Sequence, residues 1–216
     1  MNQMEASTKG PNIIPERQEI EKTFQEYMVN LGLKIEDISG KVLDIGAGEA
    51  FFAKYIEEHN LSKQIVSLDE STEGNFIHKK GAVRGSAELL PFKDGEFDIV
   101  ISHASVPRAL YLELTRENGE ELKSKLFAVL KEMLRVVRPG GQVRFGPIAE
   151  GKSYKIFYDF KKILDEVLDE LNKSDDVTAT TVQLGEVEYI NEVTGNLKDN
   201  ESYMIISKLE KPKVEE

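Results

Sequence analysis

Residues 41–50 read KVLDIGAGEA, and they carry the strongest structural signal in the chain. The first half, 41–45, is a short apolar run, which is typical of a strand buried in a parallel sheet. Gly46 and Gly48 then allow the backbone to turn sharply and to approach a ligand closely. A helical pattern follows at 50–59, and the free N–H groups of its first turn would point toward that ligand. The stretch therefore predicts a strand, a glycine loop and a helix with a binding site between them.

Strand and helix patterns alternate along most of the remaining chain. Apolar residues at helical spacing predict helices over 15–31, 50–59, 117–137 and 153–172. Short apolar runs bounded by turn residues predict strands over 41–45, 64–68, 82–84, 97–101, 142–145, 180–190 and 203–207. Because no helix separates the last two strands, we expect an antiparallel ending. The expected fold is α/β, a doubly wound, Rossmann-like three-layer sandwich whose mostly parallel sheet has an antiparallel C-terminal strand.

The length and composition are those of one globular domain. The chain has 216 residues, of which 40% are hydrophobic and 31% are charged, so it can bury a sizeable core. We expect a flexible tail at 1–12, a single domain over 13–210 and a charged tail at 211–216. The absence of cysteine excludes disulfides, thiolate metal sites and cysteine nucleophiles. No secretory signal and no apolar run of about 20 residues is present, so we expect a cytoplasmic location.

The net charge argues against nucleic acid as a partner. Lys and Arg number 28 against 39 Asp and Glu, which gives a formal net charge of −11. Such a chain is repelled by phosphate backbones unless a local basic patch overrides the average. The nearest candidate for a patch, His78-Lys79-Lys80, is too short. A small, neutral or cationic substrate fits this charge better.

Two carboxylates flank the glycine loop and restrict its ligand. Asp44 precedes the loop, where it would repel a diphosphate but attract a cationic amine. Phe51 stands where a dinucleotide fingerprint needs Gly or Ala, which argues against a nicotinamide-dependent oxidoreductase. Asp69 ends the next strand, where a carboxylate can accept both hydroxyls of a ribose. The alternative is an ordinary tight turn with two strand-end carboxylates, which any doubly wound protein can have.

Four motifs follow one another in a familiar order. They are VLDIGAG at 42–48, VSLDES at 66–71, GSAELLPF at 85–92 running into FDIV at 97–100, and LRVVRPGG at 134–141. Together these stretches resemble the class I S-adenosylmethionine-dependent methyltransferases, in particular the small-molecule-type methyltransferase domain. The resemblance implies S-adenosylmethionine as the cofactor. It also implies a set of cofactor-binding residues, namely Asp44, Gly46, Ala47, Gly48, Asp69, Glu70, Ser86, Ala87 and Ser102.

The chain departs from the family pattern at three places. Ala50 replaces the third glycine of the loop, and its methyl group is small enough to leave cofactor binding intact. Ser86 replaces an aspartate that accepts the adenine amine, and a hydroxyl accepts that hydrogen bond without charge assistance. The segment 102–107 lacks the Asn-Pro-Pro-Tyr type of motif, which argues against amide or adenine N-methylation.

The segment after the fourth strand holds the candidates for chemistry. Methyl transfer from a sulfonium is an in-line displacement, and a general base is needed only if the nucleophile holds its proton at neutral pH. His103 is the candidate base, the alternative being a loop histidine that lines the pocket or packs. Residues 104–116 are expected to form part of the substrate wall, with Arg108, Tyr111 and Arg116 as contacts, or else an ordinary strand-to-helix connection.

Three functions are compatible with these residues. The first is in-line methyl transfer to a small molecule, and the second is a non-catalytic, S-adenosylmethionine-binding partner subunit. The third is a nicotinamide-dependent oxidoreductase, which Asp44 and Phe51 both oppose. No metal site is expected, because the acids of 165–176 alternate with apolar residues at helical spacing, as on a solvated helix face. The methyl acceptor and the oligomeric state stay open.

Overall fold

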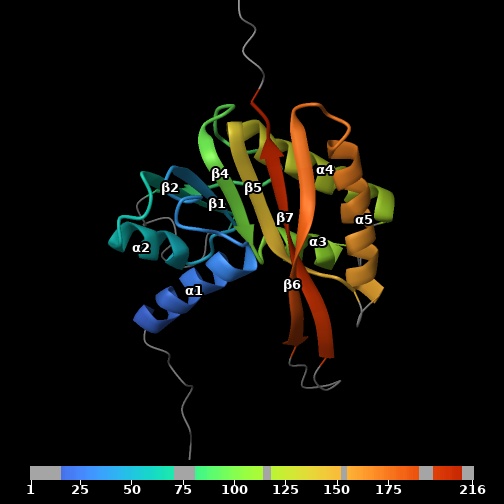
Figure 1. Ribbon diagram of the computed structural model, residues 1–216, viewed down its shortest axis with the longest axis horizontal. Helices are drawn as coiled ribbons and strands as arrows, with labels where there is room; N and C mark the ends of the chain where they lie inside the picture. The colour runs from blue at the N-terminus through green and yellow to red at the C-terminus, as the bar shows by residue number, and fades with distance from the viewer. Residues whose placement is uncertain (1–15, 71–80, 114–117, 152–154, 190–196, 211–216) are drawn as a thin grey trace, which may run out of the picture.

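One sheet of seven strands organises the molecule (Figure 1). The computed structural model describes residues 16–70, 81–113, 118–151, 155–189 and 197–210. Within these residues the strand order is β3-β2-β1-β4-β5-β7-β6. The strands are β1 (Lys41–Ile45), β2 (Gln64–Asp69), β3 (Ala82–Arg84), β4 (Phe97–His103), β5 (Val137–Ala149), β6 (Val177–Tyr189) and β7 (Leu197–Lys208).

The strand directions confirm the predicted fold class. β1 pairs in parallel with β2 and β4, and the parallel set continues to β3 on one side and β5 on the other. β7 pairs antiparallel with both β5 and β6. The sheet is therefore mostly parallel with an antiparallel ending, in a doubly wound, Rossmann-like arrangement. The carboxyl ends of the parallel strands meet at one edge, where such folds bind ligands.

Helices cover both faces of the sheet. α1 (Glu16–Asn30) and α2 (Phe51–Glu58) pack on one face, while the other carries α3 (Val106–Glu113), α4 (Gly119–Val136) and α5 (Lys155–Leu171) (Figure 1). Successive side chains of a strand point to opposite faces, so Val42 joins the α1–α2 core and Leu43 joins the core under α4 and α5. The nearly continuous apolar sequence of β1 follows from its burial on both faces.

The beginning of α4 is defined by a side-chain cap. The Oδ1 atom of Asn118 accepts a hydrogen bond from the backbone N–H of Glu121 at 2.9 Å. Glu120 and Glu121 also place negative charge in the first turn, which favours the helix dipole. At the other end, the Lys208 ammonium donates to the carbonyl oxygens of Leu134 and Val137. The predicted helix therefore begins and ends on polar contacts that satisfy its free backbone groups.

Element boundaries differ from the sequence prediction in several places, of which β5 and α3 are two. β5 extends over Val137–Ala149 rather than 142–145, because Val137 pairs with Phe97 before the chain bulges and resumes pairing at Gln142. The predicted turn at 138–141 is this bulge, with Gly140 at φ 79°. Residues 106–113 belong to the segment expected to form either part of the substrate wall or a strand-to-helix connection, and they form the helix α3.

Some expectations fall outside the described residues. The predicted tails 1–12 and 211–216, His78 and Arg116 all lie there. Among the helices that the structure does describe, each is too short or too polar to cross a bilayer.

Candidate functional site

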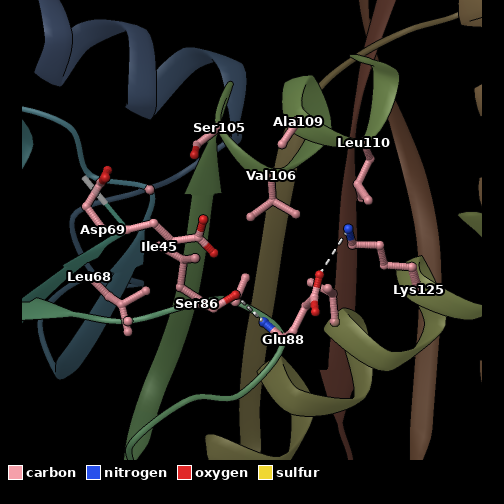
Figure 2. Close-up of a pocket in the computed structure, with 15 residues that line it drawn as sticks. Ile45, Leu68, Asp69, Ser86, Glu88, Ser105, Val106, Ala109, Leu110 and Lys125 are labelled. Atoms are coloured by element: carbon pink, nitrogen blue, oxygen red, sulfur yellow. Dashed lines mark hydrogen bonds and ion pairs between the residues drawn. The ribbon is translucent and has the colours of Figure 1, made fainter. Parts of the chain in front are cut away.

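A cavity of about 310 Å³ lies at the carboxyl ends of β1 and β2, on the face that carries α3 and α4 (Figure 2). Its floor comes from these strands, one wall from the turn after β3, and its cover from α3 and α4. The lining residues are Ile45, Gly46, Leu68, Asp69, Glu70, Gly85, Ser86, Ala87, Glu88, Ser105, Val106, Ala109, Leu110, Lys125 and Val129. Its size is at the lower end of the range for small-molecule sites.

The glycine loop is held tightly against two neighbours. The backbone N–H groups of Gly46 and Ala47 both donate to the Leu68 carbonyl, at 2.7 and 3.2 Å. Gly46 has a φ of 74°, and a Cβ at this position would lie 1.7 Å from Oγ of Ser105. Only glycine fits here, because the loop after β4 approaches the loop after β1 so closely. At Gly48 a Cβ would instead meet open space.

Asp69 fixes the other side of the loop. Its Oδ2 atom accepts a hydrogen bond from the Gly48 backbone N–H at 2.9 Å. Glu70 follows it, and both residues line the cavity. The carboxylate therefore joins the end of β2 to the glycine loop and still faces the cavity, as expected of a residue that receives ribose hydroxyls.

Asp44 lies on the opposite face of the sheet, beneath α1. Its carboxyl group is fully buried and accepts from the hydroxyl of Tyr27, at 3.4 Å for Oδ1 and 3.3 Å for Oδ2. Burial raises the pKa of Asp44 to about 8, Tyr27 lowers it, and the nearby Asp69 charge raises it further. Burial also raises the pKa of Tyr27 well above its ordinary value. At neutral pH this carboxyl group is therefore largely protonated.

His103 ends β4 on the same face as Asp44. Its Nε2 atom lies 3.0 Å from Nδ2 of Asn30, and its ring centroid lies 4.4 Å from that of Tyr27. Burial lowers the pKa of His103 to about 4, although Glu26 raises it slightly, so the imidazole is neutral at pH 7. A neutral imidazole can accept a proton, but an Asn30 amide that donates to Nε2 uses the lone pair that a base requires.

The turn after β3 forms the lower wall of the cavity. The Ser86 hydroxyl accepts from the Glu88 backbone N–H at 3.3 Å, and Ala87 lies between them. Lys125 of α4 reaches across and places Nζ 3.1 Å from Oε1 of Glu88 (Figure 2).

The structure brings together only part of the predicted site. Gly46, Asp69, Glu70, Ser86 and Ala87 line the cavity, whereas Asp44 and His103 lie beneath α1. Ala47, Gly48 and Ser102 do not line it.

The remaining predicted residues have structural contacts of their own. The Ser102 hydroxyl accepts from the Val106 backbone N–H at 3.3 Å, at the start of α3. The Tyr111 hydroxyl accepts from the Ala149 backbone N–H at 3.1 Å, and Arg108 is exposed. The described residues contain no cluster of His, Asp and Glu suited to a metal ion.

Ser105 and Lys125 are among the lining residues that the predicted site did not include. Ser105 contacts the glycine loop, and Lys125 pairs with Glu88. Ser105 lies in the segment expected to form the substrate wall, so its position after β4 was the available signal. Lys125 carried no such signal, because a lysine on an amphipathic helix is ordinarily solvated.

Comparison with known proteins finds similarity to methyltransferases. Residues 43–145 match the family described as "Methyltransferase domain". The chain is 28% identical over 121 residues to a malonyl-[acyl-carrier protein] O-methyltransferase of Erwinia billingiae, covering 54% of this chain and 42% of that protein. It is 31% identical over 151 residues to an uncharacterized protein of Methanocaldococcus jannaschii, covering 57% of this chain and 58% of that protein. The chain thus spans about half the length of the curated relatives it matches.

One solved structure shows the same fold. A chain in the complex of the Haloferax volcanii Trm112 methyltransferase activator superposes with a TM-score of 0.51 at 11% identity, covering 90% of this chain and 94% of that chain. The fold and the strand-end cavity are those of a doubly wound protein, a class in which ligands bind at the carboxyl ends of the parallel strands. Residues 43–145 thus match a methyltransferase domain, the kind of domain that the sequence motifs resemble.

The residues present fit the cofactor of that family. A carboxylate stands at the end of β2, and a glycine loop faces it with open space at Gly48. The apolar side chains of Leu68 and Val106 line the cavity and suit a flat ring. S-adenosylmethionine offers the matching groups, namely a ribose diol, a heterocycle and an amino-acid end.

Proposed function

We propose that this chain transfers the methyl group of S-adenosylmethionine to a small-molecule acceptor by in-line displacement. The observation that carries the proposal is the cavity in which Gly46, Asp69 and Ser86 converge from three separate loops. In this arrangement Asp69 and Glu70 bind the ribose hydroxyls, and Ser86 and Ala87 contact the heterocycle. Cofactor roles are also proposed for Asp44, Gly46, Ala47, Gly48 and Ser102.

The bound cofactor would supply a methyl group activated by the sulfonium charge. The protein then has to orient the acceptor and exclude water. The loop after β4 serves this purpose, because Ser105 contacts the glycine loop and α3 covers the cavity. We assign His103 as the general base for acceptors that hold a proton. Its Nε2 must first lose the contact with Asn30, so this role requires a shift of α1.

The acceptor is proposed to be a small molecule. The net charge of −11 disfavours a nucleic-acid substrate. The relative from Erwinia billingiae acts on malonyl-[acyl-carrier protein], and transfer to a carboxylate oxygen of that kind would need no base. A carboxylate acceptor would therefore leave His103 with a packing role.

A non-catalytic partner subunit is the second candidate. It is favoured by one observation, because Tyr27 engages the Asp44 carboxyl group that the cofactor amine is proposed to approach. In this reading the domain binds the cofactor and the acceptor side stays closed under α1.

The test has a binding step and a transfer step. Calorimetry with S-adenosylhomocysteine is expected to show one site, and NADH is expected not to bind. Methyl-labelled S-adenosylmethionine is then incubated with the protein and with separate small-molecule, protein and nucleic-acid fractions of a cell extract. Label in the small-molecule fraction supports the proposal, and label in a macromolecular fraction overturns the acceptor class. Cofactor binding with no labelled fraction supports the partner subunit.

A further inference from the structure

The cavity wall includes two charged residues, Glu88 and Lys125, that have no role in the proposed function. Glu88 follows the Ser86–Ala87 turn, and Lys125 projects toward it from the first half of α4 (Figure 2). Nζ of Lys125 lies 3.1 Å from Oε1 of Glu88, and both side chains line the cavity. Their side chains are 30% and 52% exposed, so this pair contributes little to folding stability. Its position over the cavity is the feature that needs an explanation.

A nucleoside ligand can extend in only one direction from the glycine loop. With the ribose at Asp69 and the amino-acid end at Gly46, two neighbouring positions of the cavity are taken. The rest of the cavity runs past Ser86 to Glu88 and Lys125 (Figure 2). The heterocycle therefore reaches this pair, and this step rests on the proposed function.

The walls on the way to the pair suit a flat ring. Leu68, Val106, Leu110 and Val129 are apolar residues that line the cavity. Apolar side chains of this kind pack against the faces of a heterocycle and leave its edges for polar groups. The polar groups at the end of this channel are the carboxylate of Glu88 and the ammonium of Lys125.

We propose that the Glu88–Lys125 pair selects the adenine ring of the cofactor. The Glu88 carboxylate accepts a hydrogen bond from the exocyclic amine, and the Lys125 ammonium donates to the neighbouring ring nitrogen, N7. Adenine presents such a donor and acceptor side by side, whereas a 6-oxo purine presents two acceptors. Glu88 thereby supplies the negative charge that an aspartate would supply at Ser86, whose hydroxyl already accepts from the Glu88 backbone.

The two residues are expected to affect different quantities. A 6-oxo ring would place an oxygen against the Glu88 carboxylate, so Glu88 sets the preference for the amine. The acceptor ring nitrogen is present in both rings, so Lys125 sets the affinity for both. Charge-assisted hydrogen bonds of this kind, half exposed to water, correspond to about a tenfold change in affinity.

The test measures binding by calorimetry of S-adenosylhomocysteine and of its 6-oxo analogue, S-inosylhomocysteine. The full chain is expected to prefer the amine by about tenfold or more. Glu88→Gln is expected to reduce that preference to about threefold or less, because an amide both donates and accepts. Lys125→Met is expected to weaken both ligands several-fold and to leave the preference unchanged.

Lys123→Met is the matched control. Lys123 lies on the same helix and pairs with Glu166 of α5 at 2.7 Å, away from the cavity. It is expected to leave both affinities unchanged, and thermal unfolding checks that every variant folds. A preference that survives Glu88→Gln within about twofold, or unchanged affinities in Lys125→Met, overturns the proposal while the cofactor site stands. Failure of the unaltered chain to bind S-adenosylhomocysteine overturns the proposed function itself.

Discussion

The hydroxyl of Tyr27 lies 3.3 Å from Oδ2 and 3.4 Å from Oδ1 of Asp44, so a side chain of α1 covers the carboxyl group that precedes the glycine loop. Both side chains are buried. The proposed partner of Asp44 is the amine of the cofactor, which would have to share or displace this contact. Under the proposed function, the position of α1 and the occupancy of the cofactor site would therefore be linked through one carboxyl group.

Tyr27→Phe should destabilise the protein by about 1–3 kcal/mol, because it leaves a buried carboxyl group without its hydroxyl donor. Urea unfolding measures this loss. Tyr55→Phe is the control, since the Tyr55 ring also stacks on Phe24 of α1 and the described residues provide no partner for its hydroxyl. Equal losses in the two variants would contradict the role of the Tyr27 hydroxyl.

Asp44 should make the unliganded protein less stable as pH rises. Burial raises the pKa of Asp44 from 3.8 to about 8, so the folded protein keeps a proton that the unfolded chain releases. The contribution of Asp44 to stability is therefore complete below about pH 4 and is lost as pH rises through about 8. In urea unfolding across this range, the stability of Asp44→Asn should rise relative to that of the unaltered protein as pH increases. A constant difference would show that Asp44 is ionised in the folded state.

Asp69→Ala should weaken binding of S-adenosylhomocysteine by about 1–3 kcal/mol, because the ribose hydroxyls lose a charged acceptor. The substitution also removes the acceptor of the Gly48 N–H, so the glycine loop loses an anchor. Calorimetry measures the change. Asp165→Ala on α5, where the carboxylate pairs with Lys161, provides a control carboxylate away from the cavity. An affinity that is the same in both variants removes Asp69 from the site.

Gly46→Ala should cost more stability than Gly48→Ala, although both glycines have a positive φ. An alanine in this region costs about 1–2 kcal/mol from the backbone alone. Only at Gly46 does the added Cβ also collide with Ser105. In a Ser105→Gly background the cost of Gly46→Ala should fall to that of Gly48→Ala, as measured by chemical unfolding. A cost that does not fall would place the strain elsewhere.

His103 should make the protein sensitive to acid. Burial lowers its pKa to about 4, against an ordinary value of 6.5, so the unfolded chain takes up a proton before the folded protein does. The contribution of His103 is present above about pH 6.5 and is lost as pH falls toward 4. His103→Gln keeps a polar partner for Asn30 and should lose less stability over this range in urea unfolding. Equal losses of stability in His103→Gln and in the unaltered protein would contradict the burial of the neutral ring.

Strands were predictable where a residue run is buried on both faces, as in β1. The ends of β5, β6 and β7 were not, since their outer residues extend the pairing beyond the apolar runs. α3 was missed because its segment is short and has Pro107 in its first turn, which the Ser102 hydroxyl holds. Such a contact depends on the bend after β4, which local sequence does not specify.

The residues of the candidate site were also predictable only in part. Gly46, Asp69 and Ser86 follow strands in the parallel sheet, and strand order alone brings them to one edge. Lys125 reaches the cavity from the first half of α4, so its place depends on how that helix packs. Tyr27 belongs to the core between α1 and α2, and its hydroxyl also contacts Asp44.

The rings between α1 and α2 lie nearly parallel. Phe24 stacks on Tyr55 at an interplanar angle of 17°, and Tyr27 stacks on Phe52 at 13°. Parallel rings keep much of their contact when one slides across the other, as in the offset stacks that aromatic pairs prefer. Separation along the ring normals breaks the contact at once. The interface between the two helices is thus stiff toward lifting and compliant toward shear, so α1 can be displaced sideways over Asp44 more easily than it can be peeled from the sheet.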